Sequence, residues 1–271
     1  MPMPDTVAIV TGASQGIGHA IAQRLVDDGV RLCLVAAPND EEQLRTVAAD
    51  LDAIFLASDV GDPTTADRAV EMTLERYGRL DWLASNAGIA YFEEALDAPL
   101  EHFDHTMHVN VRGMYLMTIA AARHMAKGSG GSIVCTASTA SFAGEEQQAI
   151  YNISKGAVAQ LTRSLALDLA QHGIRVNAVA PGWVHTPATR QIVADPGEWS
   201  KHRSRIPLDR PAEPAEIASV VRFLLSDEAS YLTGSIVVAD GGLTAGFRFT
   251  DWEAVQNPDG PRTPSVFGGN S

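Results

Sequence analysis

Short apolar runs rich in β-branched residues alternate with longer helical stretches along most of this 271-residue chain. The first pair is a strand at Val7-Ala8-Ile9-Val10 and a helix over 16–28 that Gly29 ends. Almost continuously apolar strands joined by helices predict a parallel sheet that is covered on both faces. Right-handed crossovers then make the sheet doubly wound. We therefore predict an α/β fold, a doubly wound Rossmann-type parallel sheet of about seven strands with helices on both faces.

The alternation continues to the far end of the predicted sheet. Further strands are expected at 31–36, 53–57, 80–84, 132–136, 175–180 and 235–239. Further helices are expected at 40–51, 63–77, 100–126, 151–171 and 214–225. The helix over 100–126 loses its periodicity at 108–113, which indicates a kinked turn with the Asn110 side chain held for a polar role.

No linker rich in Pro, Gly or Ser divides the chain, so one domain over residues 1–244 is expected. Residues 183–211 interrupt the alternation and are typical of a lid or substrate segment. A C-terminal extension over 245–271 is expected to dock on the same or a neighbouring subunit, and a loosely ordered end is the alternative. Docking is favoured because the extension contains four aromatic residues, Phe247, Phe249, Trp252 and Phe267.

Charge and composition exclude several classes of function. The chain has 20 Lys+Arg against 33 Asp+Glu, a formal charge of −13, which argues against nucleic acids and anionic membrane surfaces as partners. The two cysteines, Cys33 and Cys135, lie in apolar runs and are expected to be inert buried thiols, and the eight histidines are too scattered to predict a metal site. With no signal peptide and no long apolar stretch, we expect a cytoplasmic protein.

A glycine-rich turn directly follows the first strand and opens the first helix. It reads Thr11-Gly12-Ala13-Ser14-Gln15-Gly16-Ile17-Gly18, a spacing that lets backbone N–H groups and the helix dipole hold a pyrophosphate. At the end of the second strand, Ala36-Ala37 offer neither an acid for the adenosine ribose nor an arginine for a 2′-phosphate. Gln15 stands where a basic residue would favour NADP, so the sequence favours NAD and leaves NADP open.

Three side chains have the chemistry of an acid–base site. Tyr151 and Lys155 stand four residues apart on one helical face, and an ammonium near a phenol is expected to lower the phenol pKa. Ser138 follows the fifth strand at the carboxyl edge, where its hydroxyl can hold a carbonyl or alkoxide. Each residue alone has a structural explanation, as a solvated helix face or a helix cap. Their combination after a glycine-rich turn predicts acid–base chemistry beside a nucleotide.

Over about residues 5–244 the sequence resembles short-chain dehydrogenases/reductases of the common, non-extended branch. The matching segments are Thr11-Gly12-x-x-x-Gly16-x-Gly18, Asn86-Ala87-Gly88, Asn110, Ser138, Tyr151-x-x-x-Lys155 and Pro181-Gly182. The resemblance implies an oxidoreductase that transfers a hydride between NAD or NADP and a secondary alcohol or ketone. A nucleotide-binding sensor or scaffold without turnover, and an epimerase or dehydratase on the same fold, are the alternatives.

The resemblance also implies roles for individual residues. Tyr151 would be the acid/base, Lys155 would lower its pKa and bind the nicotinamide ribose, Ser138 would orient the reacting oxygen, and Asn110 would anchor a water that links Lys155 to solvent. Asp59 and Val60 would contact adenine. The implied cofactor contacts are Gly12, Ser14, Gln15, Gly16, Ile17, Gly18, Asp59, Val60, Asn86, Ala87, Gly88, Tyr151, Lys155, Pro181, Gly182, Val184 and Thr186.

Substrate identity and the physiological direction of the reaction are left open by the sequence. The variable stretches 89–96, 139–148 and 183–206 are expected to recognise the substrate, with Ser138, Glu145, Gln148, Tyr151 and Trp183 as the candidate contacts. The resemblance implies a homotetramer formed through two helices. These helices carry small residues that allow close packing, within the chain or between subunits: Ala120, Ala121, Ala122, Ala157, Ala159, Ala166 and Ala170.

Overall fold

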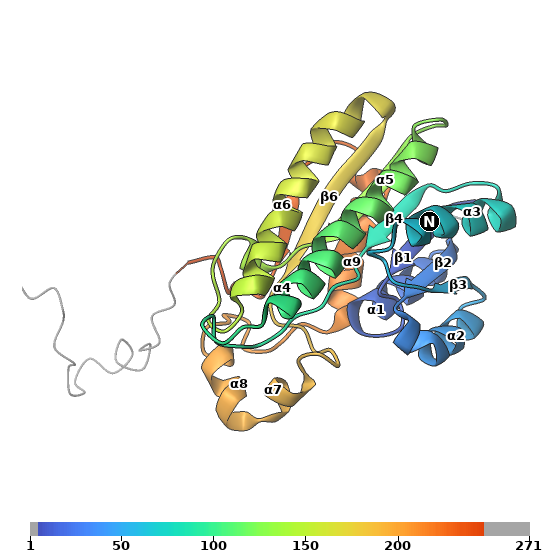
Figure 1. Ribbon diagram of the computed structural model, residues 1–271. Helices are drawn as coiled ribbons and strands as arrows, with labels where there is room; N and C mark the ends of the chain where they lie inside the picture. The colour runs from blue at the N-terminus through green and yellow to red at the C-terminus, as the bar shows by residue number, and fades with distance from the viewer. Residues whose placement is uncertain (1–4, 247–271) are drawn as a thin grey trace, which may run out of the picture.

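The computed structural model describes residues 5–246 and contains a seven-stranded parallel sheet in the order β3-β2-β1-β4-β5-β6-β7 (Figure 1). The strands are β1 Val7–Thr11, β2 Arg31–Ala36, β3 Ile54–Ala57, β4 Trp82–Ser85, β5 Gly131–Thr136, β6 Ile174–Pro181 and β7 Ile236–Ala239. Every residue of β1 is buried, as expected for a strand covered on both faces. The predicted doubly wound sheet is confirmed.

Helices cover the two faces and enclose two hydrophobic cores. Their bounds are α1 Gly16–Asp27, α2 Glu41–Asp50, α3 Pro63–Tyr77, α4 Leu100–Met107, α5 Met114–Met125, α6 Ala149–Leu169, α7 Arg190–Ala194, α8 Pro196–Arg203 and α9 Pro214–Leu225. One core joins the sheet to α3, α5 and α6, and the other joins it to α1, α2 and α9. Figure 1 shows α5 and α6 running along the same side of the sheet.

The strand order changes direction between β1 and β4. Val10 of β1 is paired with Leu34 of β2 on one side and with Ala84 of β4 on the other. Beyond β1 the chain crosses to β2 and β3, and beyond β4 it continues to β5, β6 and β7. At such a switch point the loops after the two strands diverge and leave room for a ligand at the carboxyl edge.

A π-helical turn at His108–Gly113 separates α4 from α5, at the position where the periodicity of the sequence fails. Asn110 lies in this turn with no exposed surface. Gly113 allows close packing here, because a Cβ at this position would lie 2.6 Å from Cγ2 of Val60. The predicted interruption of the long helix is confirmed, and its backbone form is a π turn, a feature often found at functional sites.

The segment 183–211 contains two short helices, α7 and α8, which the sequence analysis did not predict. Asp195-Pro196-Gly197 resembles an isolated turn, yet Asp195 caps α8 by accepting hydrogen bonds from Gly197 N and Glu198 N. Figure 1 shows both helices at the end of the sheet, next to the start of α4 and α6.

The remaining expectations concern the two cysteines, membrane-spanning helices and metal sites, and the C-terminal extension. Cys33 and Cys135 are fully buried free thiols, as predicted, and burial raises the pKa of each to about 11. Within residues 5–246, no helix has the length and apolarity needed to span a bilayer, and no group of side chains could hold a metal ion. The four aromatic residues expected to dock the C-terminal extension, at 247–267, lie outside the described residues.

Candidate active site

A cavity of about 330 Å³ opens at the carboxyl edge of the sheet, where the strand order changes direction. Its walls come from the loops after β1, β4, β5 and β6, the N-terminal turns of α1 and α6, and the segment 183–211. Most of the residues predicted from the sequence line it together: Gly12, Ser14, Gln15, Gly16, Ile17, Asn86, Ala87, Gly88, Ser138, Glu145, Gln148, Tyr151, Lys155, Pro181, Gly182, Trp183, Val184 and Thr186.

Four predicted residues do not line this cavity: Gly18, Asp59, Val60 and Asn110. A Cβ on Gly18 would lie 2.0 Å from the Gly12 carbonyl oxygen, so this glycine permits close packing behind the loop. The Asp59 carboxylate accepts hydrogen bonds from Gly61 N at 2.8 Å and from His108 Nε2 at 2.9 Å, which hold it beside the π turn. Val60 is buried in a core. Contact of Asp59 and Val60 with adenine stays a prediction.

The glycine-rich turn has the donors that a pyrophosphate requires. Gly12 and Gly16 adopt positive φ angles of 65° and 58°, which brings the backbone close to the cavity. Gln15, the residue before α1, makes no capping hydrogen bond with its side chain, so the first N–H groups of α1 are not capped by it. These N–H groups and the helix dipole fit a dinucleotide phosphate.

Thr11 and Thr136 fix the strand ends beneath the cavity, and the sequence analysis did not identify either role. Thr11 Oγ1 accepts hydrogen bonds from the backbone N of Asn86 and of Ala87, both at 2.9 Å. Thr136 Oγ1 donates to Asn86 Oδ1 at 3.1 Å. The ends of β1, β4 and β5 are therefore tied together through Asn86. A hydroxyl as the last residue of a strand is the only signal for this in the sequence.

Asp40 lies at the nucleotide end of the cavity, beside the glycine-rich turn. The Ser14 hydroxyl donates a hydrogen bond to Asp40 Oδ2 at 3.0 Å, and both residues line the cavity. By its position alone, Asp40 suits the start of the helix predicted over 40–51, where a negative charge complements the helix dipole. It does precede α2, but its side chain makes no capping hydrogen bond there. Its carboxylate instead adds a negative charge next to the turn.

The three acid–base residues converge on the opposite end of the cavity. Ser138 hydrogen-bonds the Tyr151 phenol and also accepts from Ala140 N at 3.2 Å. Lys155 Nζ donates to the Thr136 carbonyl at 2.8 Å and lies 5.5 Å from the centroid of the Tyr151 ring. Ser141 Oγ donates to the Lys155 carbonyl at 2.8 Å, which fixes the turn after β5 against α6.

Burial determines the pKa values at this end of the cavity. It raises the pKa of Tyr151 to about 12, an effect that Ser138 opposes by hydrogen bonding and that the Glu145 charge reinforces. Burial also lowers the pKa of Lys155 to about 8. The net shift of the Tyr151 pKa is therefore upward, because desolvation is the largest effect and the Lys155 ammonium donates to Thr136 rather than to the phenol. That Lys155 lowers the Tyr151 pKa stays a prediction.

Asn110 supports the site from behind rather than lining it. Its Oδ1 accepts from Ile89 N at 2.8 Å, and its Nδ2 donates to Ile89 O at 2.9 Å and to Ser154 Oγ at 3.0 Å. Ser154 in turn donates to the Tyr151 carbonyl at 2.8 Å. The amide therefore joins the loop after β4 to the second turn of α6. Its role as the anchor of a relay water stays a prediction.

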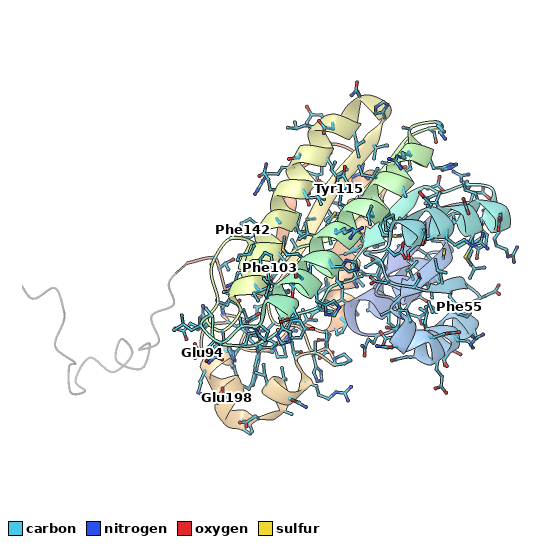
Figure 2. The ribbon with its side chains drawn as sticks, viewed as in Figure 1. Phe55, Glu94, Phe103, Tyr115, Phe142 and Glu198 are labelled. Carbon is cyan, nitrogen blue, oxygen red and sulfur yellow. The ribbon has the colours of Figure 1, made fainter. Side chains whose placement is uncertain are left out.

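The wall that contains Tyr151 also combines a carboxylate with aromatic rings. Gln148 Nε2 donates to Glu145 Oε2 at 2.9 Å, and both side chains line the cavity. Trp183 lines it too, with its ring centroid 4.1 Å from that of His202 and 6.0 Å from that of Trp199. Figure 2 shows Glu94 of the loop after β4 and Glu198 of α8 at this same end of the molecule.

The sequence and the fold both match known oxidoreductases. A family model described as enoyl-(acyl carrier protein) reductase matches residues 12–244. The chain is 40% identical to 2-(R)-hydroxypropyl-CoM dehydrogenase of Xanthobacter autotrophicus, over 88% of this chain and 98% of that protein. It is 37% identical to L-rhamnose 1-dehydrogenase (NAD(P)(+)) of a Sphingomonas strain, over 87% and 94%. The crystal structure of a short-chain type dehydrogenase/reductase from Mycobacterium marinum superposes with a TM-score of 0.83 at 34% identity, over 90% and 98%.

Proposed function

The chain belongs to the short-chain dehydrogenase/reductase family and is an oxidoreductase acting on alcohol and carbonyl groups with a nicotinamide cofactor, and we propose that Tyr151 is its acid/base. The observation that carries this proposal is the convergence of Tyr151, Ser138 and Lys155 in the cavity that also contains the glycine-rich turn. A protein that only binds or senses the nucleotide has no use for a phenol hydrogen-bonded to a serine beside a buried ammonium.

In the proposed mechanism the bound nicotinamide supplies the hydride acceptor or donor. In the oxidative direction, the Tyr151 oxygen takes the proton of the substrate hydroxyl as the hydride leaves the same carbon. In the reductive direction, the Tyr151 hydroxyl returns this proton to the carbonyl oxygen. Ser138 holds the reacting oxygen by a hydrogen bond, and the Lys155 ammonium favours the phenolate through its positive charge.

Substitution of Tyr151 by Phe tests this role directly. Loss of the phenolic oxygen removes proton transfer, so kcat should fall by about 10²- to 10⁴-fold while NADH binding stays nearly unchanged. Tyr231→Phe is the matched control, because Tyr231 is fully exposed and does not line the cavity. Turnover retained in Tyr151→Phe would refute the assignment.

For the cofactor, we propose NAD over NADP, supported by the position of Asp40. Its carboxylate lies in the cavity wall beside Ser14 and the glycine-rich turn. There it suits a ribose hydroxyl, which can donate a hydrogen bond, and it repels a 2′-phosphate. Among the described residues of the wall, Lys155 is the only Lys or Arg, and it lies at the other end, bound to Thr136.

The experiment compares kcat/KM for NADH and NADPH in the wild type and in Asp40→Asn. Removal of the charge should shift the preference toward NADPH by about 10-fold or more, because like-charge contacts cost several kcal/mol. Glu42→Gln is the control, since Glu42 is exposed on the same helix and does not line the cavity. An unchanged preference in Asp40→Asn, or a wild type that prefers NADPH, contradicts the proposal.

The assembly that we propose is a homotetramer formed through the outer faces of α5 and α6. Most of the small residues expected to form this contact are not exposed to a partner, since Ala120–Ala122, Ala159 and Ala166 are buried within the chain itself. Support comes instead from large apolar side chains on these helices, with Tyr115 48%, Ile153 53% and Leu167 82% exposed.

We also propose that residues 1–244 act as one dinucleotide-binding and catalytic domain with 183–211 as its lid. The support is that all the described strands form one sheet and that the cavity opens at the carboxyl edge of that sheet. A cytoplasmic location completes the proposal, and the two unpaired thiols, Cys33 and Cys135, are typical of a reducing compartment.

A further inference from the structure

Glu145 is the one acidic side chain at the Tyr151 end of the described cavity wall. We propose that Glu145 determines substrate specificity: its carboxylate accepts a hydrogen bond from a hydroxyl next to the reacting carbon, so that the enzyme selects neutral, vicinally hydroxylated substrates such as cyclic polyols and sugars. This inference rests on the proposed function of Tyr151, because it assumes that the substrate reacts beside this residue.

The carboxylate is held in place by its surroundings. Glu145 Oε2 accepts a hydrogen bond from the buried side chain of Gln148. The other carboxylate oxygen, Glu145 Oε1, has no partner among the described residues. Asn152 Nδ2 donates to the Glu145 carbonyl at 2.9 Å and so fixes the backbone of this residue on the first turn of α6. One oxygen is thus positioned by the protein, and the other remains available to a ligand.

The loop that carries Glu145 is also fastened to the other substrate loop. Gln147 O accepts from Glu93 N at 2.8 Å, and Gln147 Nε2 donates to Glu94 Oε1 at 2.8 Å. Gln147 adopts a positive φ of 59°, an uncommon conformation for a residue with a side chain. The two loops thus form one rigid wall, which limits the loss of entropy when a substrate binds.

The charges around the cavity disfavour an anionic substrate. Glu145 lines the same cavity as Tyr151 and accepts a hydrogen bond from Gln148, three residues before Tyr151, and its charge acts to raise the pKa values of both Tyr151 and His202. Lys155 is the only Lys or Arg in the described wall, and its ammonium is already bound to the Thr136 carbonyl. Burial lowers the pKa of His202, which therefore adds no positive charge at neutral pH. A carboxylate or phosphate beside the reacting carbon would face Glu145 without a compensating cation.

The aromatic side of the cavity suits the C–H faces of a hydroxylated ring. Trp183 is held by a tilted ring contact with His202 of α8 and by an edge contact with Trp199. Phe92 adds a second apolar surface to the same wall. A cavity wall that contains both aromatic side chains and a fixed carboxylate can contact the apolar and the hydroxyl-bearing parts of one ring at the same time.

The test uses four alcohols that share a six-membered ring and differ in the group next to the reacting carbon: cyclohexanol, 1,2-cyclohexanediol, 2-aminocyclohexanol and 2-hydroxycyclohexanecarboxylate. In the wild type we expect kcat/KM to be highest for the diol and lowest for the hydroxy acid. In Glu145→Ala the value for the diol should fall by about 10- to 100-fold, the range for loss of one hydrogen bond to a charged group. The value for cyclohexanol, which has no neighbouring hydroxyl, should stay within about 3-fold.

The Glu145→Gln variant distinguishes the effect of the hydrogen-bond acceptor on specificity from the effect of the negative charge. A glutamine oxygen still accepts from a hydroxyl, so the diol should keep part of its advantage while the hydroxy acid gains about 10-fold from the relief of repulsion. Glu146→Ala is the control, because Glu146 lies next in the chain, is exposed and does not line the cavity. The Glu145 variants lower the Tyr151 pKa for all four substrates alike, so a pH profile distinguishes that general effect from the selective loss of the diol.

Three outcomes would overturn the inference while leaving the proposed function intact: no preference for the diol, an equal loss for the diol and cyclohexanol in Glu145→Ala, or the highest wild-type value for the amino alcohol. A different result would overturn the proposed function itself, namely NADH binding without turnover of any of the four substrates, or equal turnover by the Tyr151→Phe variant.

Discussion

At the scale of single residues, burial at the reacting end disfavours charge on both Tyr151 and Lys155. It raises the pKa of the phenol to about 12 and lowers that of the ammonium to about 8. Lys155 is only 3% exposed, and its one hydrogen-bond acceptor is the Thr136 carbonyl. A cation in this position costs folding stability, as expected for a group that serves the chemistry of a site rather than the packing of the core.

This cost predicts a pH dependence of stability. The pKa of Lys155 is about 8 in the folded chain and 10.5 as the reference, so between these pH values the unfolded state binds more protons. The free energy of unfolding should therefore rise with pH, by about 2 kcal/mol from pH 7 to 9.5 through this group alone. Below pH 8 both states are protonated and the penalty is present in full.

Urea unfolding of the wild type and Lys155→Met, without added nucleotide, measures this effect. The rise with pH should disappear in Lys155→Met and persist in Lys127→Met, which removes an exposed lysine. Equal pH dependence in all three proteins would contradict a lowered Lys155 pKa.

At the scale of elements, the π turn connects the loop after β4 to α6, the helix that carries Tyr151 and Lys155. Asn110 makes this connection with three hydrogen bonds, to both backbone groups of Ile89 and to Ser154. Asn110→Ala leaves these buried groups without partners and should destabilise the chain by about 2–4 kcal/mol. Because Ile89 and Tyr151 line the cavity, kcat of Asn110→Ala should fall as well, whereas its KM for NADH should change less.

Denaturant titration and steady-state kinetics test this prediction, with Asn39→Ala as the control because Asn39 is exposed. Asn110→Asp keeps the acceptor for Ile89 N but buries a carboxylate with one oxygen against the Ile89 carbonyl, so it should destabilise the chain at least as much as Asn110→Ala. If Asn110→Ala were as stable as Asn39→Ala, the connecting role would be refuted.

The elements also show what could be predicted from the sequence. Strands and long helices were predictable because their apolar periodicity reflects burial, and α9 was placed at its observed bounds of Pro214–Leu225. The helices α7 and α8 were missed because neither contains a buried residue, so no apolar period marks them. Motif spacing identified most of the residues that line the cavity. It did not reveal the Asp40–Ser14 contact or the direction of the Tyr151 pKa shift, which depend on three-dimensional packing.

At the scale of the whole molecule, a formal charge of −13 on each 28.8-kDa chain opposes self-association, whereas exposed apolar side chains on α5 and α6 favour it. Charge repulsion between subunits is screened by salt over about 8–10 Å at physiological strength. If the proposed tetramer forms through these helices, its stability is the balance between these two effects. Association should therefore strengthen as the salt concentration rises.

Leu167 is the position at which this balance is tested most directly. Its side chain is 82% exposed on α6, and burying a charge there in each subunit would cost at least about 2 kcal/mol per copy. Light scattering should give the mass of four chains for the wild type at moderate salt and a smaller mass for Leu167→Glu. Leu96→Glu is the matched control, because Leu96 is 99% exposed but lies on neither helix, and it should leave the mass unchanged. A wild type that is monomeric at every salt concentration would refute the tetramer. An unchanged mass for Leu167→Glu would place the subunit contact on another face.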